Sequence, residues 1–152
     1  MKRILGSIFG WHTDTILIAE PDRVLRQLEG RALSREYQIL PTSSAEEAVR
    51  TAARHETVID LLLTEVRLPR VEGWELTELI KLDYPDLKVV YMSSSIDAET
   101  RAHTGAPIVV VLENPFRPYR LQSAVRHALE TRQNDRALKR GVYAPSVSPL
   151  LR

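Results

Sequence analysis

Acidic and hydroxyl side chains follow directly on apolar runs of strand length at several points of this sequence. Glu20 and Asp22 come after one such run, Glu65 follows a second, and Ser93 follows a third. Hard cations such as Mg²⁺ bind through several oxygen ligands, so the three carboxylates are candidates for a divalent-cation site. Asp22 has a second interpretation, because an aspartate before a periodic apolar run is typical of a helix N-cap. No histidine–acid pair is placed to activate Ser93 or the serines after it, which favours a helix-capping loop over a nucleophile.

The chain alternates between apolar runs that predict strands and patterns of helical period. The predicted strands are residues 15–19, 37–40, 58–63, 87–92 and 107–112. A helical pattern follows each of them. In the first pattern, Val24, Leu25, Leu28 and Leu33 recur at roughly helical spacing. The second begins with serine and has a glutamate spaced for a capping box. The third and fifth apolar runs show almost no alternation of polar and apolar residues, which indicates strands that are covered on both faces.

Five strands, each followed by a helix, predict an α/β protein of the flavodoxin-like (βα)5 type. We expect a three-layer sandwich with a parallel five-stranded sheet in the order 2-1-3-4-5. Functional sites of such folds lie outside the carboxyl ends of the strands. Glu20, Glu65, Ser93 and Asn114 all stand at those ends, so we expect them to converge at one edge of the sheet.

The composition is that of an ordinary soluble domain. Apolar residues make up 43%, charged residues 27%, and the net charge of +1 draws the chain to neither nucleic acid nor membrane. The absence of cysteine excludes disulfides, cysteine-ligated zinc and thiol catalysis. No apolar run has the length of a membrane span and no signal-peptide pattern is present, which favours a cytoplasmic protein. We expect an N-terminal arm at residues 1–13, one domain at 14–131, and an extension of the last helix with a C-terminal tail at 132–152.

Several segments in order resemble the receiver domain of bacterial two-component response regulators. They are "AEPD" (19–22), "DLLLTEVRLPRVEGWEL" (60–76), "PDLKVVYMSS" (85–94) and "ENPF" (113–116). The resemblance covers roughly residues 14–131. It implies a domain that takes a phosphoryl group from a histidine kinase onto an aspartate at the end of strand 3. An acid pair after strand 1 would help to hold Mg²⁺, and a hydroxyl and a lysine would contact the phosphoryl oxygens.

The residues at these family positions depart from the receiver pattern. Glu65 stands at the phosphoacceptor position, Asn114 at the lysine position, and Glu20 and Pro21 at the acid pair. Only Ser93, at the hydroxyl-switch position, matches. Proline offers no side-chain oxygen to a metal, asparagine carries no positive charge, and glutamate moves the carboxylate outward by one methylene. Since a displacement of ~1 Å can slow a reaction ~100-fold, the three changes together argue against efficient phosphotransfer.

The resemblance and its departures predict a stand-alone pseudo-receiver that is not an enzyme, has no cofactor, and acts by docking on another protein. The switch aromatic of strand 5 is also absent, since Val111 stands there. The fixed charge of Glu65 either imitates the phosphorylated state or is a relic. The first alternative function is a receiver that is still phosphorylated on Glu65 with Mg²⁺. The second is an adaptor that binds nucleic acid through its basic last helix.

The last helix is strongly basic and is expected to extend beyond the sheet. Residues 117–140 hold seven basic residues and two acidic ones. A solvated basic face is the simplest interpretation, followed by an acidic protein partner or a homodimer formed through this helix. Nucleic acid is disfavoured, because no recognition motif accompanies the charge.

Arg67 is the nearest candidate to balance the charge of the acidic pocket. It lies two residues beyond Glu65 and therefore on the same side of an extended segment. An arginine fork suits carboxylates, so we predict that Arg67 pairs with Glu65 or Glu20. The alternative is an arginine that extends into solvent and contributes little to stability.

Overall fold

The computed structural model describes the backbone of residues 13–93, 109–113 and 117–139, and the side chains of residues 13–93 and 117–131. Its elements are β1 (Thr15–Ala19), α2 (Arg23–Leu33), β2 (Gln38–Thr42), α3 (Ala45–Arg54), β3 (Leu61–Glu65), α4 (Gly73–Asp83), β4 (Lys88–Ser93), β5 (Val109–Glu113) and α6 (Pro118–Lys139). The helix predicted after Ser93 lies outside the described residues, as do Asn114 and most of the two terminal segments.

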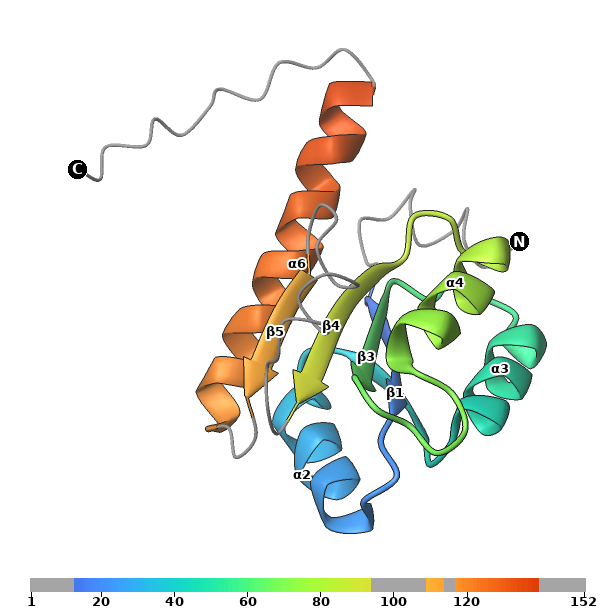
Figure 1. Ribbon diagram of the computed structural model, residues 1–152. Helices are drawn as coiled ribbons and strands as arrows, with labels where there is room; N and C mark the ends of the chain where they lie inside the picture. The colour runs from blue at the N-terminus through green and yellow to red at the C-terminus, as the bar shows by residue number, and fades with distance from the viewer. Residues whose placement is uncertain (1–12, 94–108, 114–116, 140–152) are drawn as a thin grey trace.

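The strands form one sheet in the order β2-β1-β3-β4-β5, and every neighbouring pair is parallel (Figure 1). The predicted flavodoxin-like sheet and its strand order are therefore confirmed. All of β1 and the first four residues of β3 are buried. Helices cover both sides of these central strands, so neither side has to be polar, and this is why their sequences do not alternate.

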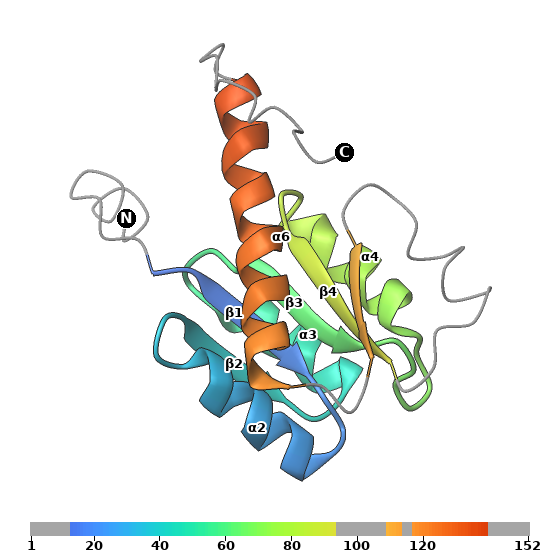
Figure 2. The same ribbon diagram turned by 90° about the vertical axis from the view of Figure 1, so that its left-hand side faces the viewer.

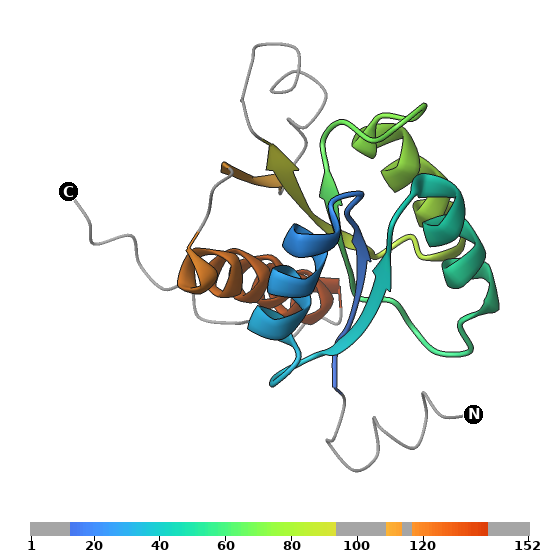
Figure 3. The same cartoon turned by 90° about the horizontal axis from the view of Figure 1, so that it is seen from below.

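Two apolar layers hold the helices against the sheet. Helices α3 and α4 lie side by side on one face, and α2 and α6 lie on the other (Figures 2 and 3). Leu17 and Leu62 belong to the layer under α3 and α4. Ile18 and Leu63 belong to the layer under α2 and α6. Each such fully buried side chain stabilises the fold by roughly 1.5–3 kcal/mol. Successive side chains of a strand point to opposite layers, so the residues at the strand ends also point to one layer or the other.

The bounds of several strands differ from the prediction, and two of these differences bear on the site and on the sheet. β3 starts later than expected and includes Glu65 as its last residue, so this carboxylate projects from the strand itself. β2 continues to Thr42 and contains Pro41. A proline is tolerated there because β2 is an edge strand that pairs only with β1.

Helix α2 is capped as the sequence indicated, but the side that it buries is not the side that carries Val24 and Leu28. Asp22 is the N-cap, and its Oδ1 accepts a hydrogen bond of 2.9 Å from the Leu25 amide. Val24 and Leu28, whose spacing helped to predict the helix, are 64% and 49% exposed. The buried side of the helix instead contains Glu29, which is 1% exposed. A charged residue thus occupies a position that an apolar residue would be expected to fill.

Helix α6 continues without a break from Pro118 to Lys139. Figure 1 shows its C-terminal half projecting past the sheet. Its first half packs on the sheet through an apolar stripe that includes Leu121, Val125 and Ala128. Within the described part of the chain, no helix is both long and apolar enough to cross a membrane.

Candidate functional site

The carboxyl ends of β1 and β3 bring Glu20 and Glu65 together. Ala19 is in register with Thr64, so the residues that follow them stand at the same level of the sheet. Side chains alternate along a strand, and Ile18 faces the layer under α2 and α6. Glu20 lies two residues after Ile18, and Glu65 lies two residues after Leu63, which faces the same layer. Both glutamates therefore point to the layer under α2 and α6. The predicted convergence of these two carboxylates is a property of the sheet register.

Ser93 completes the described part of this edge. It is the last residue of β4, is buried, and follows Met92, which is in register with Glu65. The role of Ser93 as the hydroxyl-switch position stays a prediction. Asn114, at the lysine position, lies outside the described residues.

Glu20 is held in place by the start of α2. It is 3% exposed, and its Oε1 accepts a hydrogen bond of 2.9 Å from the Asp22 amide. The Arg26 guanidinium donates to the Glu20 carbonyl oxygen at 2.7 Å, so it fastens the backbone of the β1–α2 turn. The other carboxylate oxygen of Glu20, Oε2, is buried and has no hydrogen-bond donor among the described residues.

Glu29 adds a third carboxylate that the sequence analysis did not select. Both of its carboxylate oxygens are buried, and no group in the described part of the chain donates a hydrogen bond to them. Burial, then the charges of Glu20 and Glu65, raise the pKa of Glu29 from its ordinary value to about 9. Its spacing was a detectable signal, because residue 29 stands four residues from both Leu25 and Leu33 on one side of the helix. Among the described side chains, the acidic group at this edge therefore consists of Glu20, Glu29 and Glu65.

The other acidic candidate, Asp22, has a structural role. Its side chain is exposed and caps α2, so the N-cap interpretation is confirmed. Arg67 is also exposed, and its backbone forms a bridge with Glu72 across the loop after β3. The pairing of the Arg67 guanidinium with Glu65 or Glu20 stays a prediction.

The loop after Glu65 turns the chain sharply into α4. The Gly73 amide donates to the Val66 carbonyl at 2.7 Å, and the Leu68 amide donates to the Val71 carbonyl at 3.2 Å. Arg70 has a φ of 69°, a left-handed conformation that is uncommon for a residue with a side chain. A Cβ on Gly73 would collide with the Glu65 carbonyl oxygen. The packing of Gly73 thus fixes the backbone that carries Glu65.

The donor set at this edge does not fit a divalent cation. Pro21, which follows Glu20, has no side-chain oxygen, and one oxygen of Glu20 is already engaged by the Asp22 amide. Among the described residues, no three histidine, aspartate or glutamate side chains are arranged to hold a metal ion.

We therefore expect the stability of the protein to be insensitive to Mg²⁺. A ligand raises stability by RT ln(1 + [L]/Kd), so an ion without a site leaves the Tm nearly unchanged at millimolar concentration. Thermal unfolding with and without MgCl₂, with NaCl at equal ionic strength as the control, measures this. A rise of several degrees that is specific to Mg²⁺ would contradict the expectation.

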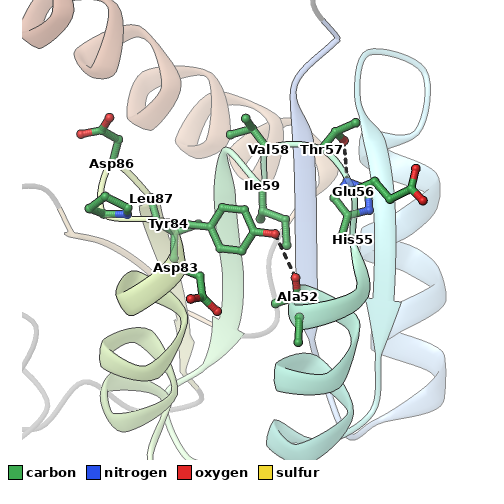
Figure 4. Close-up of a pocket in the computed structure, with 12 residues that line it drawn as sticks. Ala52, His55, Glu56, Thr57, Val58, Ile59, Asp83, Tyr84, Asp86 and Leu87 are labelled. Atoms are coloured by element: carbon green, nitrogen blue, oxygen red, sulfur yellow. Dashed lines mark hydrogen bonds between the residues drawn. The ribbon is translucent and has the colours of Figure 1, made fainter. Parts of the chain in front are cut away.

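A separate hollow lies at the opposite edge of the sheet (Figure 4). It has a volume of about 570 Å³ and lies between the C-terminal ends of α3 and α4. Tyr84 donates to the Ala52 carbonyl at 2.9 Å, and His55 is hydrogen-bonded to Thr57 at 2.7 Å. Ile59, just before β3, also lines it. The hollow is therefore separated from Glu65 by the length of β3.

Known proteins match this chain over most of its length. The family model described as "Response regulator receiver domain" matches residues 16–126. The DNA-binding transcriptional regulator NtrC of Azospirillum brasilense is 34% identical over 128 residues, which are 82% of this chain and 26% of that protein. The response regulator protein FleR of Pseudomonas aeruginosa is 33% identical over 119 residues, 75% of this chain and 24% of that protein. The chain thus spans about a quarter of the length of these relatives.

Solved structures agree in fold. The crystal structure of a response regulator receiver protein from Sinorhizobium medicae superposes with a TM-score of 0.70 at 26% identity, covering 80% of this chain and 98% of that one. A signal receiver domain from Pseudomonas fluorescens gives a TM-score of 0.72 at 24% identity, covering 81% of this chain and 99% of that one. The matched region contains the sheet, its helices and the edge with Glu20, Glu29 and Glu65.

Proposed function

The chain belongs to the family of response regulator receiver domains, and we propose that it is a signalling module of a two-component or phosphorelay system that works without phosphotransfer. The observation that carries this proposal is which residues stand at the carboxyl ends of the strands, referred to below as the carboxyl edge. Glu65 extends from the end of β3, and Pro21 follows Glu20 where a second acid would serve a metal ion. A carboxylate without a divalent cation lacks the charge that promotes transfer of a phosphoryl group.

Glu65 brings a permanent negative charge to this position. Its carboxylate stands about one carbon–carbon bond further from the backbone than that of an aspartate would. One functional form of the proposal is that this charge imitates a phosphorylated aspartate, so that the module is constitutively in one signalling state. The other is that the edge is a relic and signalling depends on the surface of the module alone.

Exposed apolar side chains support an action by docking. Val24 and Leu28 stand one turn apart on the outer side of α2, and Tyr119, 57% exposed, stands in the first turn of the neighbouring α6. Arg23 and Arg120 are exposed beside them. Apolar residues with a basic rim suit an amphipathic partner with acidic groups at its border. The extension of α6 supports a second proposal, a homodimer formed through this helix.

The proposal predicts that phosphorylation fails. Incubation of the protein with acetyl phosphate and Mg²⁺ is expected to leave the intact mass unchanged, because Glu65 is displaced and no metal ion is held beside it. A receiver with an intact acid pair, aspartate and lysine, treated in the same way, serves as the positive control. Stoichiometric addition of one phosphoryl group to Glu65 would refute the proposal and establish the phosphorylated alternative.

A further inference from the structure

Glu29 is a buried acid on the sheet side of α2. It is 1% exposed, and neither of its carboxylate oxygens has a hydrogen-bond donor among the described residues. Glu20 Oε2 shares both properties: it is buried and lacks a donor. The Glu20 carboxylate lies close enough to accept a hydrogen bond from a protonated Glu29. Two carboxylates can form no hydrogen bond with each other, but a carboxyl group and a carboxylate can.

Among the residues that the structure describes, few charged groups surround the two acids. Arg26 on α2 lies near Glu29, but its guanidinium donates to the carbonyl oxygens of Glu20 and Pro21, at 2.7 and 3.4 Å. Glu65 at the end of β3 adds a further negative charge. Met92 and Ser93 at the end of β4 carry no charge. On α6, Gln122 donates a hydrogen bond to the Ala32 carbonyl, and Arg126 pairs with Glu36, which follows α2.

Two neighbouring carboxylates cannot both stay ionised in such a place. Burial disfavours the charged form of Glu29, and the negative charges of Glu20 and Glu65 disfavour it further. Either a cation or a proton must reduce the charge. The donor set around Glu20 does not fit a divalent ion, as described above, whereas a single proton requires only the two carboxyl groups that are present.

We propose that Glu29 and Glu20 form a buried carboxyl–carboxylate pair that binds one proton at neutral pH, with the Glu29 carboxyl donating to Glu20 Oε2. The proton satisfies two buried oxygens and removes one negative charge between α2 and the sheet. It thereby takes over part of the charge compensation that a metal ion would supply at this edge. The inference is independent of whether Glu65 accepts a phosphoryl group.

The pair makes the folded state depend on pH in a defined direction. The pKa of Glu29 is higher in the folded protein than in the unfolded chain, so the folded state binds the proton more tightly. The stabilising effect is complete below the unfolded pKa, near 4.5, and is lost as the pH rises through the folded value of about 9. Between these limits the folding equilibrium constant falls up to tenfold for each pH unit.

Glu29→Gln tests this dependence, because glutamine keeps the shape of the protonated acid and cannot ionise. Urea unfolding of both proteins is measured from pH 5 to pH 9. We expect the ratio of the folding constants, variant over wild type, to increase with pH by a factor that approaches ten per unit. Glu46→Gln, at an exposed position of α3, is the matched control and should show a ratio independent of pH. A constant ratio for Glu29→Gln would overturn the proposal.

Infrared spectroscopy of the wild-type protein tests the proton directly and does not depend on any variant that folds poorly. At pH 7 we expect the carbonyl band of one protonated carboxyl group, absent from Glu29→Gln. Glu20→Gln should shift the loss of this band to lower pH, because it removes the neighbouring charge. A spectrum at pH 7 with carboxylate bands only would refute the proton. A Mg²⁺- or Ca²⁺-dependent rise of Tm that disappears in Glu29→Gln would assign the pair to a cation instead.

Discussion

Gly73→Ala is expected to destabilise the protein by roughly 3 kcal/mol, the upper part of the range for overpacking. A Cβ at this position would collide with the carbonyl oxygen of Glu65 and would lie 3.3 Å from the Thr64 methyl group. The obstacle is backbone at the end of the central strand β3, so no side chain can turn aside to make room. Relief would require the end of β3 or the start of α4 to move.

The matched control for this substitution is Gly30→Ala. Gly30 lies within α2, and a Cβ there would meet nothing within 4 Å. Alanine in a helix interior is favoured over glycine by about 0.5–1 kcal/mol, so this variant should be more stable than the wild type. Chemical unfolding of the three proteins at one pH measures both effects. If Gly73→Ala were as stable as the wild type, the close approach of α4 to Glu65 would be incorrect.

Restoring the receiver residues is expected to change the chemistry of the edge from inactive to active. In the triple variant Pro21→Asp, Glu65→Asp and Asn114→Lys, a second acid becomes available beside Glu20. The phosphoacceptor retreats by one methylene, and a cation is supplied. We expect acetyl phosphate with Mg²⁺ to add one phosphoryl group to the triple variant and none to the wild type, as read by intact mass.

Partial variants show which change is limiting. Glu65→Asp alone should remain unmodified, because the nucleophile is corrected while the second acid and the lysine are still missing. Pro21→Asp alone should introduce a Mg²⁺-dependent rise of Tm, which the wild type is expected to lack. A triple variant that folds, binds Mg²⁺ and still fails to accept a phosphoryl group would show that another part of the edge prevents the reaction. Glu29 would then be the first residue to replace.

Much of the fold follows from local sequence patterns. Apolar runs of five or six residues without alternation predicted central strands, because residues that are covered on both faces have no reason to be polar. The order of the strands followed from the handedness and short length of the crossovers. The placement of Glu20, Glu65 and Ser93 at one edge was also predictable, since each follows a strand and parallel strands end on the same side. The role of Asp22 as a helix cap could be predicted from the neighbouring residues alone, because a cap depends only on local sequence.

The sequence did not reveal which charges are buried and which apolar residues are exposed. Val24 and Leu28 contributed to a helical pattern and yet face solvent, while Glu29 lies between α2 and the sheet. Helical spacing defines which residues share a side, but the packing of α2 against β1 and α6 decides which side is covered. The bounds of β3 depended likewise on pairing with β1 and β4, and pairing is a contact between residues distant in the sequence.

The sequence by itself thus determined the class of fold, the topology and the identity of the groups that directly follow the strands, because these depend on residue type and order along the chain. Only the tertiary structure decided that Gly73 must be small and that Glu29 faces Glu20 without a donor. The reason is that a steric limit and a pKa both depend on distances across the fold. Neither the Glu65 carbonyl over Gly73 nor the desolvation of two acids is encoded in any one segment.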